Sequence, residues 1–217
     1  MDKKIFILLL ILALSSSVHA LDASHHQETT LNTLLNLKTK AFPELAQSEI
    51  RLQTFQENDA YFQSNFDFWT LFGTEPIYII EMNPELIQRG CPEEAVEAIL
   101  AHELSHTLDY VQGGIPKIIQ IGWDYLSVDK RAIYEHRTDL NAIFRGYGSG
   151  LIQYREWIYA QLTPEQLKLK KHLYYQPQEI HEIQKRIQSL KPDEQLALER
   201  IWLNQPPMNI QEIKAPL

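Results

Sequence analysis

The sequence lacks two features that define other classes of protein: the disulfides of small cross-linked proteins and the basic clusters of nucleic-acid-binding proteins. Cys91 is the only cysteine among 217 residues, so no intramolecular disulfide can form. Acidic residues exceed basic ones by 28 to 20, the net charge is −8, and the basic residues form no cluster. This balance argues against a nucleic acid as partner or substrate. A chain of this length can still bury one hydrophobic core without cross-links.

Long hydrophobic runs are also lacking. The longest, Ile5 to Leu14, covers ten residues, which is half of the ~20 needed to span a bilayer. It follows Lys3-Lys4 and precedes Val18-His19-Ala20, a cleavage-site pattern, so residues 1–20 are predicted to be an export signal. No cysteine follows the run to accept a lipid. We therefore expect a periplasmic or secreted protein with no stable membrane anchor after cleavage.

One short pattern carries chemistry, the HExxH sequence from His102 to His106. Residues four apart lie one above the other on a helix, with Cβ atoms about 5–6 Å apart. Both imidazoles can therefore reach one cation at roughly 2.0–2.1 Å. Glu103 lies on an adjacent flank, where its carboxylate can reach a water bound to that cation. The spacing predicts a zinc site with Glu103 as general base.

The residues around this motif predict that it lies inside a helix. Ala95 to Ala101 and Thr107 to Val111 place apolar residues at a helical period. Pro92 suits the first helical position, and Gly113-Gly114 followed by Pro116 predicts the end of the helix. Two histidines and a glutamate in a buried helix would be costly without a partner such as a metal ion.

A catalytic zinc usually has three protein ligands and a water, so a third ligand is expected downstream. Gln112 stands where an HExxHxxGxxH site would have its ligand, and its amide is a poor one for zinc. A better candidate segment is Tyr134 to Asp139, in a helix expected from Lys130 to Phe144. Within it, Glu135 and Asp139 are four residues apart.

HExxH followed by ExxxD on a second helix resembles the gluzincin zinc metallopeptidases, the group that contains thermolysin and the CaaX-processing proteases. The resemblance covers these two short motifs. It implies that zinc is held by His102, His106 and Glu135. It also implies that Glu103 is the catalytic base and that Asp139 orients His102. The last role has its own reason, because a zinc-bound histidine generally donates its other ring N–H to a carboxylate or carbonyl.

Two positions depart from the thermolysin pattern, since Tyr134 replaces its Asn and Thr138 its Ser. His136 is the alternative third ligand, because imidazole binds zinc as well as carboxylate does. We favour Glu135, because it comes with Asp139 at the expected spacing. A thiolate of Cys91 that masks the zinc is a further alternative. We instead expect this side chain to pack as a small apolar residue.

The expected fold is a mostly helical α+β domain over residues 21–217, zincin-like, with a small sheet before the HExxH helix. A helix is expected from Leu31 to Phe42, and strands at Glu49 to Phe55 and Ile77 to Met82. In zincins a strand placed like the last one borders the cleft and can pair with an extended peptide. The other reading is a strand buried within the sheet.

Helices dominate the rest of the chain. Gly146 to Gly150 interrupts the pattern before a helix from Leu151 to Gln161. Thr163 begins a capping box, and Pro177 and Pro192 each suit the start of a further helix. Gln205-Pro206-Pro207 predicts the end of regular structure before an extended tail.

These observations predict zinc-dependent hydrolysis of peptide bonds in a peptide or protein substrate. Zinc would lower the pKa of its water to about 7, and Glu103 would carry the proton to the leaving amine. An oxyanion donor is also needed, and Tyr110, Tyr147 and His172 are chemically able. Tyr147 is favoured because glycines flank it. The alternative function is an exported zinc-binding or protein-interaction domain without turnover.

Overall fold

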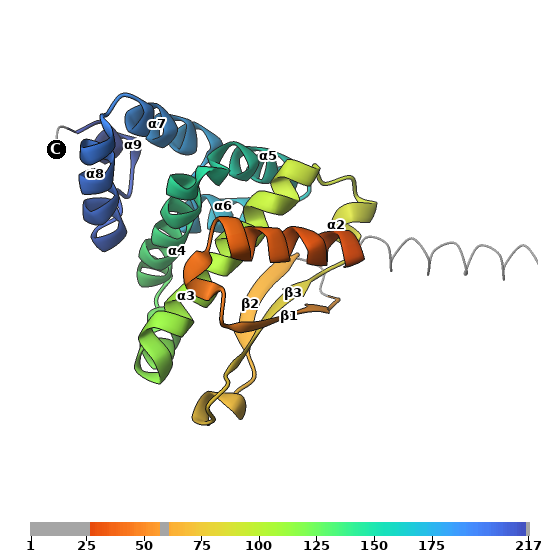
Figure 1. Ribbon diagram of the computed structural model, residues 1–217. Coiled ribbons are helices and arrows are strands. Elements are labelled where there is room, and N and C mark those ends of the chain that lie inside the picture. The colour runs from red at the N-terminus through yellow and green to blue at the C-terminus, as the bar shows by residue number, and fades with distance from the viewer. Residues whose placement is uncertain (1–26, 57–60, 216–217) are drawn as a thin grey trace, which may run out of the picture.

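The computed structural model describes residues 27–56 and 61–215. Within these ranges a three-stranded sheet is followed by a series of helices, which confirms the predicted mostly helical α+β fold with its small sheet before the HExxH helix (Figure 1). No helix in the described part of the chain is long and apolar enough to cross a membrane. The predicted export signal, residues 1–20, lies outside the described residues.

The sheet has the order β1-β3-β2. β1 (Glu49–Thr54) runs parallel to β3 (Ile77–Met82), and β2 (Phe62–Phe66) runs antiparallel to it. β1 and β3 lie where the sequence predicts them. β2 was not predicted, because three polar residues between two phenylalanines give a weak strand signal. β3 alternates between half-buried and buried residues, with Tyr78 and Ile80 among the buried ones, which turns one face of the sheet toward the helices.

A helix at residues 27–40 precedes the sheet and contributes Leu34 and Leu37 to the main core. Its described part already includes residues before Leu31, and it ends at residue 40, before the predicted end at Phe42. The short 3₁₀ helix η1 (Pro43–Leu45) connects it toward β1, and α2 (Glu85–Gln88) follows β3.

α3 (Glu93–Asp124) is the longest described helix, and it carries the HExxH motif. Gly114 breaks it, with φ 57° and ψ −158° that other residues rarely adopt. The predicted end at Gly113-Gly114 is therefore right as a break but wrong as an end, because a second helical segment follows. Pro116 lies in the first turn of that segment, where its missing N–H costs nothing.

α4 (Val128–Ala142) runs back past α3, and its N-terminus is capped by the Ser127 side chain, which accepts from the backbone N–H of Lys130. A π-helical turn, η3 (Ile143–Tyr147), and α5 (Gly148–Tyr159) continue it. The predicted interruption from Gly146 to Gly150 is thus confined to one residue, Gly146, with φ 99°.

The remaining helices are α6 (Pro164–Leu173), α7 (Pro177–Gln188), α8 (Pro192–Asn204) and α9 (Ile210–Lys214). α6 follows the predicted capping box at Thr163, and α7 and α8 begin at the predicted Pro177 and Pro192. The predicted extended tail is wrong, because α9 forms within it, capped by the Asn209 side chain and anchored by buried Ile213. Five residues are too few for a periodic signal.

The main core joins the sheet, α3, α5 and the C-terminal helices. Cys91 lies in it, and burial raises the pKa of its thiol to about 12, so the side chain is the small apolar residue expected. α3 and α5 pack closely at Gly150. A Cβ there would meet the carbonyl oxygen of Glu94 and lie 2.6 Å from the Cβ of Ala98.

This close approach predicts that Gly150→Ala lowers the free energy of unfolding by about 1–3 kcal/mol, the usual cost of overpacking. Gly122→Ala is the matched control, because an added Cβ there meets nothing within 4 Å and alanine favours a helix by up to about 1 kcal/mol. Urea denaturation of both variants measures the difference. Equal stabilities would mean that α3 and α5 are not packed this closely.

Candidate metal centre

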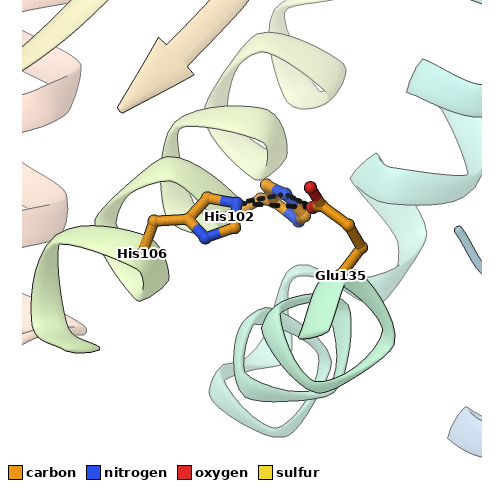
Figure 2. Close-up of side chains that lie close together, drawn as sticks. All are labelled: His102, His106 and Glu135. Carbon is orange, nitrogen blue, oxygen red and sulfur yellow. Dashed lines mark hydrogen bonds and ion pairs between the residues drawn. The ribbon is translucent and has the colours of Figure 1, made fainter. Parts of the chain in front are cut away.

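Three ligand atoms from α3 and α4 converge on one point (Figure 2). Nε2 of His102 lies 3.2 Å from Nε2 of His106. Oε2 of Glu135 lies 3.3 Å from the first of these nitrogens and 3.4 Å from the second. All three residues are buried, and among the described residues they form the one group with metal-ligand geometry.

The size of this triangle fits a small tetrahedral ion. Ligands at about 2.0–2.1 Å from a tetrahedral centre are about 3.3–3.4 Å apart, so the observed edges match one face of a zinc coordination shell. A calcium site would instead use six to eight oxygens at longer distances. Two imidazole nitrogens and one carboxylate oxygen are also ligands that zinc accepts.

One oxygen of the Glu135 carboxylate contacts neighbouring side chains, and the other faces the two histidines. Oε1 accepts a hydrogen bond of 2.7 Å from the hydroxyl of Tyr125 and lies 3.7 Å from Nε of Arg131. Oε2 is buried and faces only the Nε2 atoms of the two imidazoles, which have no proton to donate when they bind a metal. A buried carboxylate oxygen without a partner is costly, and a cation at the centre of the triangle would satisfy it.

His102 is oriented by a second carboxylate. Its Nδ1 lies 2.8 Å from Oδ1 of Asp139, which is fully buried. Asp139 also accepts from Nη2 of Arg155, at 2.9 Å and 3.1 Å to its two oxygens, and from the backbone N–H of Tyr175. A proton on Nδ1 that donates to Asp139 leaves the lone pair of Nε2 for a metal.

His106 is oriented by the two residues that depart from the thermolysin pattern. Its Nδ1 lies 3.0 Å from the hydroxyl of Tyr134 and 3.4 Å from the hydroxyl of Thr138. The Tyr134 ring also packs beside the imidazole, with centroids 5.0 Å apart. Both hydroxyl oxygens can accept from a proton on Nδ1, which leaves the lone pair of Nε2 for a metal.

The pKa values show that the charged forms of His102 and Glu135 stabilise one another. Burial alone would lower the pKa of His102, but hydrogen bonds to Asp139 and Glu135 raise it to about 9. Burial alone would raise the pKa of Glu135, but the charges and hydrogen bonds of His106 and His102 hold it well below its usual range. The glutamate is thus ready to bind a cation as a carboxylate.

Glu103 stands beside the triangle without belonging to it. It is buried and lines the same pocket as the two histidines. Burial raises the pKa of its carboxyl above the ordinary value, against the lowering effect of His106 and His102. It therefore borders the pocket beside the two histidines, and its role as general base stays a prediction.

The triangle opens on a pocket of about 470 Å³ between β2 and the second segment of α3. Phe62 and Phe66 of β2 line one side, and Ile118, Ile121 and Tyr125 line the other. A volume in this range is typical of sites that bind a ligand. The ligand triangle therefore borders a pocket with room for part of a ligand.

The structure separates the alternatives that the sequence left open. His136 points away from the triangle, stacks on Tyr175 at 4.0 Å between centroids, and has no hydrogen-bond partner on either ring nitrogen. Among the three possible oxyanion donors, Tyr110 lines the pocket. Tyr147, the favoured one, packs against the main core, and His172 pairs with Asp129 on the surface.

Sequence reasoning missed several residues that complete the site. Arg155 comes from α5, and Tyr125 lies at the C-terminal end of α3. Tyr174, between α6 and α7, lines the pocket with its ring 5.9 Å from that of His102. No spacing in the sequence links these residues to the motifs, because packing between helices brings them together.

Comparison with models of protein families, with curated proteins and with solved structures gave no match.

The geometry predicts that Glu135→Ala loses bound zinc, because the triangle then lacks one corner, whereas His136→Phe keeps it. Phenylalanine can retain the stacking on Tyr175, and neither nitrogen of His136 has a partner to lose. Metal content after dialysis against a micromolar chelator measures the difference. If His136→Phe instead lost its zinc and Glu135→Ala kept it, His136 would be the third ligand and the site would have three histidine ligands.

Proposed function

We propose that this protein is a zinc metallopeptidase that hydrolyses peptide bonds by the gluzincin-type arrangement of its residues. The observation that carries the proposal is the triangle of His102, His106 and Glu135, which has the dimensions of a tetrahedral zinc face and opens on a pocket beside Glu103. From the sequence of residues 1–20 we also propose that the protein acts outside the cytoplasm.

Zinc held by these three residues would polarise the scissile carbonyl and lower the pKa of a bound water. Glu103 would take the proton from that water and pass it to the leaving amine. Its raised pKa suits this double task, because a group must both accept and release the proton within one turnover. Asp139 and Tyr134 would keep the two imidazoles in the orientation that presents Nε2.

Tyr174 is the residue that we propose as oxyanion donor. It lines the pocket beside His102, and the guanidinium of Arg155 lies 4.4 Å from its ring centroid. Burial raises its pKa well above the usual range, so the hydroxyl keeps its proton and can donate it in a hydrogen bond. The charge that develops on the carbonyl oxygen would be stabilised by that bond.

The edge of β2 is the place where a peptide main chain would bind. β3 has a partner strand on each side, so it cannot add another. β2 is paired with β3 alone among the described strands, and Phe62, Ser64 and Phe66 line the pocket. An extended peptide that pairs with this edge would pass in front of the ligand triangle.

The alternative, a zinc-binding domain without turnover, is less well supported. Structural zinc sites are usually closed by four protein ligands, most often cysteine and histidine. Here three ligand atoms converge, and the described residues offer a pocket where a fourth ligand would stand. An open position beside a buried glutamate is the arrangement that hydrolysis needs.

Replacement of the base tests catalysis separately from metal binding. Glu103→Gln should keep its zinc and its fold but hydrolyse peptides at least ~10²-fold more slowly, the usual scale for loss of a general base. Zinc content and kcat on a peptide library are the two measurements. A metal-free variant would show that Glu103 is a ligand, and an unmodified zinc-loaded protein that cleaves nothing would favour the binding domain.

The oxyanion donor is tested by two tyrosine variants that lose the same atom. Tyr174→Phe should lower kcat about 10²- to 10³-fold with zinc retained, the usual loss for one such donor. Tyr147→Phe is the control, because that hydroxyl does not line the pocket, and it should leave kcat unchanged. Equal kcat values for the two variants would remove Tyr174 from the mechanism.

A further inference from the structure

We propose that the substrate is a polypeptide stretch rich in large apolar side chains, taken up along an apolar surface that extends outward from the pocket over both of its walls. This inference rests on the proposed function, since it names the substrate class of the same site. It depends on three features of the described residues: the lining of the pocket, the second segment of α3, and the connection between β2 and β3.

Away from the ligand triangle the pocket is lined mainly by aromatic and aliphatic side chains, with Gln63 and Ser64 of β2 as polar neighbours. Charged side chains line it only at the metal centre, through Glu103 and Glu135. The opposite walls are formed by Phe66, which packs edge-on against Tyr110 at 5.6 Å, and by Ile118 and Ile121. An apolar side chain placed between these walls would gain free energy from burial.

One wall continues into exposed apolar residues on the second segment of α3 and the turn after it. Ile119, Trp123 and Leu126 are 56%, 67% and 77% exposed. Helical spacing places the first two one turn apart, on the flank next to the face that carries Ile118 and Gly122. Large apolar side chains gathered next to a pocket are typical of a surface that binds another molecule.

The other wall continues into an aromatic cluster between β2 and β3. Phe68 lies 5.5 Å from Trp69 and 5.3 Å from Phe72, ring centroid to centroid, and the three are 55%, 82% and 65% exposed. This connection, with the short 3₁₀ helix η2 (Thr70–Phe72), projects from the body of the protein (Figure 1). Phe66, which lines the pocket, lies two residues before the cluster.

An apolar polypeptide fits these features better than other occupants. Both extensions begin at residues that line the pocket, so a chain held at the metal centre would pass along them. Residues 66–76 carry two acidic residues and no basic one, which gives anionic lipid no attraction. Stretches of large apolar residues are buried in folded proteins, so the substrates would be unfolded or disordered chains.

Two peptides of equal length and net charge test the proposal, one with Leu and Phe at the positions where the other has Ser and Gln. The zinc-loaded protein should cleave the apolar peptide with a kcat/KM at least ~10-fold higher. Fluorescence anisotropy should show that zinc-loaded Glu103→Gln also binds the apolar peptide more tightly than the polar one. Trp69→Ser combined with Phe72→Ser should reduce both preferences and keep the zinc and the cleavage of the polar peptide.

Ile201→Ser is the matched control, because this apolar side chain is 51% exposed on α8, away from the pocket, and its loss should change neither preference. Equal kcat/KM and equal binding for the two peptides would overturn the inference. Failure to cleave either peptide would count against the proposed function, and the binding ratio would still decide on the surface.

Two further measurements separate this substrate from other occupants of the apolar surface. Sedimentation velocity of the protein alone should show a monomer, and co-sedimentation with phosphatidylcholine vesicles should leave the protein in the supernatant. A dimer lost in the Trp69→Ser, Phe72→Ser variant would assign the surface to a second copy of the chain. Vesicle binding lost in the same variant would assign it to a membrane, and either result would overturn the proposal.

Discussion

The carboxylate of Asp139 is the group on which both the candidate metal centre and the helix packing depend. It is fully buried and accepts from Nδ1 of His102 on α3, from the guanidinium of Arg155 on α5, and from the backbone N–H of Tyr175 before α7. Loss of one partner from a buried ion pair typically costs ~3–5 kcal/mol. A change at Asp139 would therefore act on the fold and on the imidazole orientation together.

The charges around this carboxylate explain why the site suits a divalent cation. The buried residues here include three carboxylates, those of Glu103, Glu135 and Asp139, and one guanidinium, that of Arg155, which contacts Asp139. When all are ionised and both imidazoles are neutral, as metal ligands are, the negative charges exceed the positive one by two. Buried charges are stable only when they are balanced, and a cation of charge +2 held by Glu135 and the two imidazoles would balance them.

The sequence predicted the parts of this protein that depend on local spacing. His102 and His106 lie one helical turn apart, so their convergence follows from the helix alone. The position of Glu135 opposite them needs only a second helix that packs on the first. The contacts of Arg155 and Tyr174 depend on how α5 and the α6–α7 connection pack, and no pattern in one sequence encodes that.

The break at Gly114 divides α3 into a segment that carries the two histidines and a segment that lines the pocket. Before the break, almost every side chain near His102 is buried, so a substitution there would displace His102 or His106. After it, Ile118, Ile121 and Tyr125 face the pocket from a segment with its own direction. Substitutions in that segment, apart from Tyr125 with its bond to Glu135, can reshape the pocket without moving a ligand. Selection or design could therefore retune what this site accepts while its chemistry stays constant.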